Sequence, residues 1–259
     1  MKNTTFTLIG GPTVLIEIGG LRLLTDPTFD PANNDYALGP VTLTKTASPA
    51  QTSASLGHID AILLSHEQHS DNLDHAGREL AKSVPRIFTT PESALQVGEN
   101  AIGLHPWKEA FLAAPDGRRL RITATPARHG PEGAAAFAGE VTGFLLQWEG
   151  ENQGALYISG DTVWYEGVAA VAQMFDVGVA LLNLGAARIA PVGPSDLTMN
   201  AEGAIEAARA FANAKIIPAH YEGWAHFSEP RAEVERQFAS AGMSHRLNWL
   251  QPGVPTRIG

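Results

Sequence analysis

Three short apolar runs stand close together near the N-terminal end of the sequence. They cover residues 6–9, 14–18 and 21–25, and a Gly-Gly pair separates each run from the next. Paired glycines between apolar runs are typical of tight hairpin turns, so the pattern predicts three consecutive antiparallel strands. The following segment, 27–57, is rich in Pro, Asn, Thr and Ser and has little periodicity, and we interpret it as a long ordered loop.

Beyond this segment, strand-like and helix-like patterns alternate along the chain. Apolar runs predict strands at 59–64, 86–89, 119–125, 142–148, 157–159, 179–183 and 215–218. Apolar residues at helical spacing predict helices at 73–81, 91–97, 163–174, 200–212 and 230–240. A meander followed by alternating strands and helices indicates two packed sheets with helices outside them. The sequence contains no linker or tandem repeat, so we expect a single domain over residues 1–259.

The composition is typical of a globular protein and favours a small-molecule substrate. The 259 residues are 44% hydrophobic and 17% charged, with a net charge of −9 and no dense cluster of Lys and Arg. Nucleic-acid binders carry a basic patch, so a small-molecule substrate is favoured over a nucleic-acid partner. The chain has neither the apolar window of a membrane span nor the pattern of a cleaved signal peptide, so we expect no membrane partner and a cytoplasmic location. The oligomeric state stays open.

Histidine and aspartate residues follow several of the predicted strands. The stretch LLSHEQHSDNLD, residues 63–74, places His66, His69 and Asp71 directly after one strand. Three further strand ends carry His129 in PARHG, Asp161 in SGDT and His220 in PAHYEG. Imidazole nitrogens and carboxylate oxygens are ligands of divalent zinc, manganese and iron, and a chain without cysteine has no thiolate to offer. If these four strand ends converge, they form a site for a divalent metal.

The order of these motifs resembles the metallo-β-lactamase fold superfamily. Its signature is H-x-H-x-D-H after a strand, then a distant His, an Asp preceded by Gly, and a final His. The stretches GLRLLTDPTFD at 20–30 and LYISGDTVWYEGV at 156–168 look like the branch that includes L-ascorbate 6-phosphate lactonase. The resemblance implies a four-layer αββα sandwich, in the α/β (α+β) class. It also implies hydrolysis by metal-activated water of a small ester, lactone, amide or phosphoester, with a lactone favoured.

The resemblance also implies which residues hold the metal, with one or two ions per chain and zinc or manganese favoured. The first ion would bind His66, His69 and His129, with Asp161 bridging to the second. The second ion would bind Asp71, Asp161 and His220. Asp71 would in addition be catalytic, orienting the attacking water and carrying a proton to the leaving group.

The loop at 66–72 departs from the family pattern. In one alignment Glu67 stands where the first His belongs, and in the other His66 is that ligand and one residue has been inserted before His69. We favour His66, because a loop absorbs an extra residue more readily than a site absorbs the loss of an imidazole. Asn72 replaces the last His, which predicts a weaker second site, or one filled by an ion such as manganese that accepts oxygen ligands.

Other residues could support the ligands or contact substrate. Asp26 could cap a turn or hydrogen-bond a metal-binding histidine, and Arg128 and Arg188 could hold an anionic group or pair with surface carboxylates. His226 could line the site, although a packing role is favoured. Two alternatives to a lactone-type hydrolase stay open, a phosphodiesterase and a non-catalytic metal-binding or sensor protein on the same fold.

Overall fold

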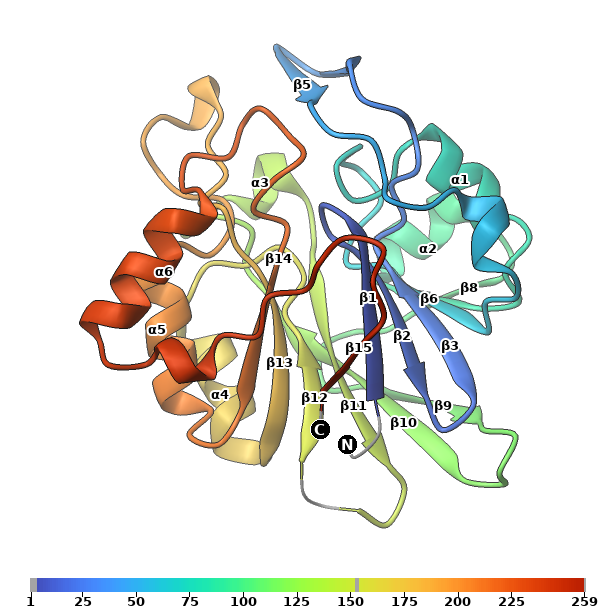
Figure 1. The fold of residues 1–259 in the computed structure, drawn as a ribbon. Coiled ribbons are helices and arrows are strands. Elements are labelled where there is room, and N and C mark those ends of the chain that lie inside the picture. Colours follow the sequence, from blue (N-terminus) through green and yellow to red (C-terminus); the bar gives the residue numbers. More distant parts are fainter. Residues whose placement is uncertain (1–3, 152–153, 259) are drawn as a thin grey trace.

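Two β-sheets lie face to face at the centre of the molecule (Figure 1). The computed structural model describes residues 4–151 and 154–258. The first sheet contains, in spatial order, β15 (Thr256–Ile258), β1 (Thr4–Gly10), β2 (Thr13–Ile18), β3 (Leu21–Thr25), β6 (Ala61–Leu63), β7 (Ile87–Thr89) and β8 (Ala101–Gly103). The predicted N-terminal meander is present, since β1, β2 and β3 pair in antiparallel order. From β3 to β8 the neighbouring strands are parallel.

The second sheet is also mixed. It contains, in spatial order, β14 (Lys215–Ala219), β13 (Val177–Asn183), β12 (Ala155–Ile158), β11 (Thr142–Trp148), β10 (Arg119–Pro126) and β9 (Glu109–Ala113). Strands β12, β13 and β14 are parallel, so their carboxyl ends meet at one edge of the sheet. Parallel strands in open sheets commonly deliver functional residues at this edge.

Helices cover the outer face of each sheet, which gives four layers (Figure 1). Helices α1 (His75–Ala81) and α2 (Pro91–Val97) lie against the first sheet, and α4 (Glu166–Met174), α5 (Ala201–Ala210) and α6 (Arg231–Ser240) lie against the second. The buried side chains form three layers of core to match: one between the sheets, around Phe6 and Phe144, and one beneath each set of helices. The expected four-layer αββα sandwich is confirmed. Within the described residues, no helix has both the length and the apolar character needed to cross a membrane.

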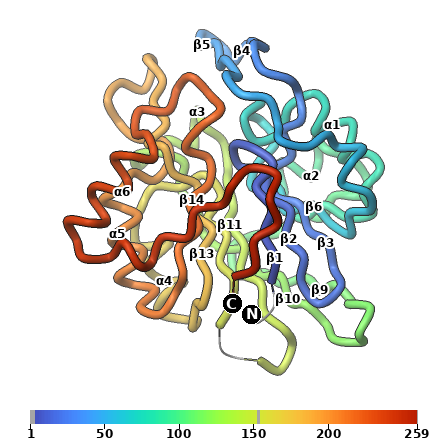
Figure 2. Tube along the Cα trace, in the orientation of Figure 1, coloured from blue at the N-terminus to red at the C-terminus, as the bar shows by residue number. Residues whose placement is uncertain are grey.

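The interpretation of residues 27–57 as a loop is wrong for part of that segment. Strands β4 (Asn34–Leu38) and β5 (Val41–Lys45) pair as a separate hairpin, followed by the short helix η1 (Ser53–Leu56). Figure 2 shows the hairpin at the same end of the molecule as α3 (Ala135–Ala138). The apolar residues of the hairpin alternate and share one face, which packs against Trp224. This packing, rather than a strong local pattern, stabilises a two-stranded ribbon that would be marginal alone.

A buried ion pair joins the hairpin to α1. Lys45 Nζ lies 2.8 Å from Asp74 Oδ2, and the two side chains are only 4% and 0% exposed. The same carboxylate caps α1 by accepting the backbone N–H of Gly77 at 2.8 Å, and it also accepts the N–H groups of Phe29 and Asp30. The carboxylate therefore holds three chain segments together beside the ends of the central strands.

Candidate metal centre

Three buried histidines converge from two loops. His66 and His69 lie in the loop after β6, and His129 follows β10. His69 Nδ1 lies 2.9 Å from His66 Nε2 and 3.2 Å from His129 Nε2. Nitrogen ligands about 2.0–2.1 Å from a tetrahedral zinc ion stand about 3.3 Å apart, which is close to these separations. The three ring nitrogens are therefore spaced as one face of a coordination shell.

In His66 and His129, the hydrogen bond made by Nδ1 determines that Nε2, which faces the cluster, carries the lone pair. His129 Nδ1 lies 2.8 Å from the carbonyl oxygen of Leu197, which can only accept, so Nδ1 carries the hydrogen and Nε2 presents a lone pair. His66 Nδ1 lies 2.8 Å from Ser65 Oγ, which also accepts a hydrogen bond from Asn72 Nδ2. The Ser65 oxygen can accept from both groups, and His66 Nε2 then faces the cluster without a hydrogen.

Burial keeps His66 and His69 neutral. Desolvation, followed by repulsion from neighbouring imidazoles, lowers the pKa of His69 to about 4 and holds that of His66 well below its usual value. Both rings are therefore uncharged near pH 7. Neutral imidazole is the form that binds a metal ion, so protons compete little for these nitrogens.

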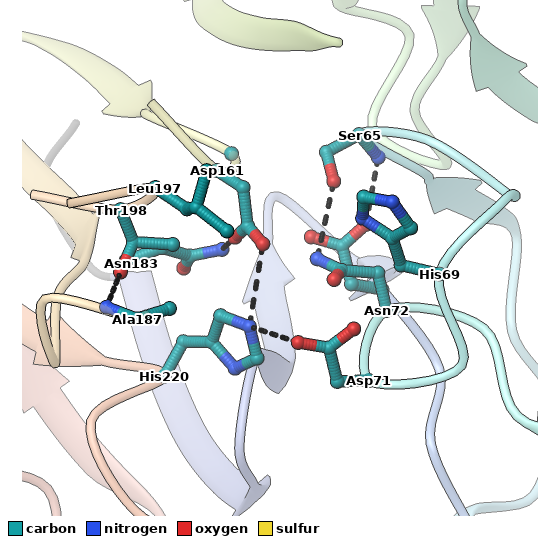
Figure 3. A network of polar contacts seen from close by, with 12 residues as sticks. Ser65, His69, Asp71, Asn72, Asp161, Asn183, Ala187, Leu197, Thr198 and His220 are labelled. Atoms are coloured by element: carbon teal, nitrogen blue, oxygen red, sulfur yellow. Dashed lines mark hydrogen bonds and ion pairs between the residues drawn. The ribbon is translucent and has the colours of Figure 1, made fainter. Parts of the chain in front are cut away.

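A second group forms beside the first from Asp71, Asp161 and His220 (Figure 3). His220 Nε2 lies 3.4 Å from Asp71 Oδ2 and 3.4 Å from Asp161 Oδ2. Burial opposes charge on all three, but their mutual attraction prevails: the pKa of each carboxyl is lowered, and that of His220 is raised to about 10. The group thus holds two carboxylates and one imidazolium out of contact with water.

The loops that deliver this group are held in unusual conformations. His220 has φ 52° at the end of β14, in a region that non-glycine residues rarely adopt. Gly160, before Asp161, has φ +58°, and a Cβ there would lie 2.5 Å from the carbonyl oxygen of Thr142. Asn183 Nδ2 donates to Asp161 Oδ1 at 2.8 Å and fixes the carboxylate (Figure 3). Sequence reasoning missed Asn183, although it ends the predicted strand at 179–183. Strained backbone of this kind concentrates at functional sites.

The unpaired atoms of the second group test whether a metal ion fits. Among the described residues, Asp71 Oδ1, Asp161 Oδ2 and both ring nitrogens of His220 are buried without a hydrogen-bond partner. Each such atom costs free energy unless something satisfies it. His66, His69 and His129 on one side, and Asp71, Asp161 and His220 on the other, each bring ligand atoms within 4.8 Å of one another. This nitrogen and oxygen donor set fits one or two divalent ions.

The two alignments of the first loop place different residues at the centre. The structure brings His66 into the histidine cluster, while the carboxylate of Glu67 turns away and pairs with Arg78 at 2.6 Å. Asn72 Nδ2 donates to Ser65 Oγ at 3.3 Å, and its Oδ1 is buried without a partner in the described chain.

The remaining candidate residues divide between the site and its surroundings. Asp26 Oδ1 accepts the backbone N–H of Ser65 at 2.7 Å, so it holds the start of the ligand loop; burial and the nearby Asp161 raise its pKa to about 8. His226 reaches the site, with Nε2 3.0 Å from Asp71 Oδ2. Arg128 lies over the ring of Tyr165, 4.4 Å from its centroid. Its guanidinium is therefore engaged outside the two metal-ligand groups.

Comparison with known proteins agrees with this fold and site. The model of the "Beta-lactamase superfamily domain" matches residues 21–221, so the chain belongs to the beta-lactamase superfamily. A metal-dependent hydrolase of Pelotomaculum thermopropionicum is 27% identical over 253 residues, covering 95% of this chain and 96% of the relative. Among solved structures, the isothiocyanate hydrolase from Delia radicum gut bacteria has a TM-score of 0.82 at 23% identity, covering 98% of this chain and 99% of that one. The metallo hydrolase Igni18 of Ignicoccus hospitalis has a TM-score of 0.72 at 21% identity, covering 100% and 99%.

The family and fold expected from the motif order are confirmed. The protein is a metal-dependent hydrolase of the metallo-β-lactamase superfamily.

Proposed function

We propose that the protein holds two divalent ions and uses them to hydrolyse a small carbonyl or related electrophilic substrate, with a lactone or ester favoured. The observation that carries this proposal is the meeting of two buried groups of three His and Asp side chains, each with ligand atoms within 4.8 Å of one another, and the unpaired nitrogens and oxygens of the second group. His66, His69 and His129 would bind one ion. Asp71 and His220 would bind the other, and Asp161 would bridge both. Zinc and manganese suit these ligands.

Bound ions of this kind supply hydroxide near neutral pH and polarise the bond under attack. The side chains of the protein do the remaining work. In this proposal Asp71 would orient the attacking water and carry its proton to the leaving group. His226, whose Nε2 lies 3.0 Å from Asp71 Oδ2, would hold this carboxylate in position. Asn183 and Leu197 hold Asp161 and His129 in their ligand orientations.

The lactone preference follows from the resemblance of residues 20–30 and 156–168 to the lactonase branch. The similar structure of an isothiocyanate hydrolase suggests a second kind of neutral electrophile. The central carbon of an isothiocyanate is open to attack by water. Both substrate kinds belong in a test panel. The alternative is phosphodiesterase chemistry, which the same ligand types could also support.

The test combines metal content with turnover. Purified protein, loaded separately with zinc and manganese, is analysed for metal per chain and assayed with δ-valerolactone, a p-nitrophenyl ester, phenethyl isothiocyanate and bis(p-nitrophenyl) phosphate. We expect close to two ions per chain and turnover of at least one neutral substrate. Turnover of the phosphodiester alone would favour the alternative, and tight metal binding without turnover of any substrate would favour a sensor.

A matched pair of variants tests the assignment of the first loop. His66→Gln removes a proposed ligand, so it should lower both metal content and turnover. Glu67→Gln changes only the partner of Arg78, so metal content should stay at the wild-type level. Loss of metal in Glu67→Gln but not in His66→Gln would reverse the assignment.

A further inference from the structure

We propose that this centre selects an uncharged substrate with an apolar arm, and that the arm lies in a pocket beside the histidine cluster. This inference rests on the proposed hydrolytic function and names its substrate class. A pocket of about 500 Å³ opens next to His69, within the range of small-molecule sites. It is lined by Leu38, Pro40, Val41, His69, Pro131, Phe137, Ala138, Ile189, Pro191, Val192 and Leu197.

Two residues that line the pocket also belong to the proposed metal centre or hold one of its ligands. His69 contributes its ring to the pocket and to the histidine cluster. Leu197 lines the pocket, and its carbonyl oxygen accepts the hydrogen bond that orients His129. A substrate whose reactive bond lies at the metal ions would therefore extend its remaining part along this apolar surface.

Charge is missing from this pocket. Among the described residues that line it there is no Lys, Arg, Asp or Glu, and His69 is the one titratable side chain. The two arginines that the sequence offered for an anionic group are engaged elsewhere: Arg188 pairs with Asp196 at 2.6 Å, and Arg128 lies over Tyr165. An anionic substrate arm would lose its hydration here and gain no counter-charge, which is unfavourable.

Phe137 shows that part of the apolar lining is open to solvent. Its side chain, on α3, is 55% exposed and lines the pocket. The adjoining segment is not loose, because Gln68 Nε2 donates to the carbonyl oxygens of Ala138 and Glu140 at 2.9 and 3.2 Å. Since Gln68 lies between His66 and His69, the ligand loop directly positions this wall of the pocket.

The β4–β5 hairpin forms another wall of the pocket. Leu38 and Val41 are paired across its turn, and both line the pocket. Tyr36 and Leu43, the next pair on the same face, pack with Trp224 and anchor the hairpin. The pocket is therefore a built surface with a fixed apolar face, which suits an aliphatic or aromatic arm.

Two esters of equal length provide the test, with the zinc- or manganese-loaded protein. p-Nitrophenyl hexanoate ends its acyl chain in a methyl group, and mono-p-nitrophenyl adipate ends a chain of the same length in a carboxylate. Each buried methylene favours binding by about fourfold, so hexanoate should exceed p-nitrophenyl acetate in kcat/KM by on the order of 100-fold. Hexanoate should also exceed the adipate ester by at least about tenfold. Equal or inverted preference between hexanoate and adipate overturns the proposal.

Variants place the preference in this pocket. Val192→Lys introduces a cation into the lining, so the hexanoate-to-adipate ratio should fall by at least about tenfold. Phe137→Ser should lower the hexanoate-to-acetate ratio. The control is Leu95→Ser, which changes an 84% exposed apolar residue on α2 outside the lining and should leave both ratios unchanged. Ratios that do not move in Val192→Lys and Phe137→Ser would overturn the assignment of the arm to this pocket.

A binding measurement separates this inference from the proposed function. If none of these esters is hydrolysed, the hydrolytic proposal fails for esters, and the neutral fluorescent probe N-phenyl-1-naphthylamine then reports on the pocket alone. Saturable binding that weakens in Val192→Lys and not in Leu95→Ser supports an apolar ligand site. Absence of saturable binding, or binding that is equal in Val192→Lys and wild type, rejects it.

Discussion

Replacement of Lys45 by methionine tests the buried ion pair that joins the hairpin to α1. Methionine keeps most of the volume of the side chain and removes its charge, which leaves the carboxylate of Asp74 buried without its cation. Removing one partner of a buried pair costs about 3–5 kcal/mol. Three backbone N–H groups at 2.7–2.9 Å still donate to this carboxylate, so the loss should fall near the lower end, about 3 kcal/mol.

The assay is urea unfolding with linear extrapolation, together with the thermal midpoint. For a chain of this size, a loss of about 3 kcal/mol lowers Tm by about 6–12 °C, and the urea midpoint should fall without a change in m. Lys82→Met is the matched control, because Lys82 pairs with Glu79 on the surface with its side chain 66% exposed. Exposed pairs contribute little, so the control should unfold like the wild type.

The result that refutes this reasoning is a Lys45→Met protein as stable as the control. It would mean that the three N–H donors alone satisfy the Asp74 carboxylate. The hairpin would then be held by its packing on Trp224 and not by charge.

Three further predictions concern the centre itself. Gly160→Ala should destabilise the fold by about 3 kcal/mol, measured by thermal or urea unfolding. The backbone there has φ +58°, which disfavours a residue with a Cβ, and that Cβ would also meet the carbonyl oxygen of Thr142. Unchanged stability would contradict the observed turn. His226→Gln should lower kcat by about 10–100-fold while metal content stays at the wild-type level, since the lost contact is to Asp71; parallel loss of metal would instead make His226 a ligand. Metal binding to the metal-free protein at pH 7 should release at least one proton, because the neighbouring carboxylates outweigh burial and raise the pKa of His220 to about 10. The His220 ring is therefore protonated before binding, and conversion of bound water to hydroxide would add to the number of protons released. Calorimetry in two buffers of different ionisation enthalpy measures this release, and a value near zero would contradict it.

The sequence predicts the order of most strands and helices, because local patterns of apolar residues determine these elements. The meander, the alternating strands and helices and the ends of the central strands all follow from runs of apolar residues. The sequence placed His129, Asp161 and His220 at the ends of predicted strands and left their convergence as a condition. In the structure β12, β13 and β14 are parallel, and β10 runs in the same direction because β11 is antiparallel to both β10 and β12, so these strands end at a common edge. The fold brings these three residues and the loop at 66–72 together.

Tertiary contacts decide what the sequence left open. Spacing alone could not choose between His66 and Glu67, and the structure separates them because Arg78 draws Glu67 away from the centre. The hairpin at 34–45 was missed because its stability depends on Trp224, far along the chain. Strand β15 has only three residues and pairs with β1, so its pattern is too short to recognise.

The sequence also contained no sign of the residues that hold the ligands and the pocket wall in position, because these roles depend on tertiary contacts. Asn183 and Gln68 are ordinary polar residues in the sequence, and their roles appear only when the chain folds. One holds a carboxylate and the other holds the wall of the pocket.

The apolar pocket has a consequence for how such proteins diversify. Apart from His69 and Leu197, its lining comes from the β4–β5 hairpin, the segment around α3 and the short helix η2 (Ala190–Val192) with the residue before it, and none of these is a strand of the two central sheets. Insertions, deletions and point changes in these three segments can therefore alter which molecules are accepted without moving the histidines and aspartates. Among homologues, chemical specificity should vary with the length and polarity of these segments while the reaction machinery stays constant.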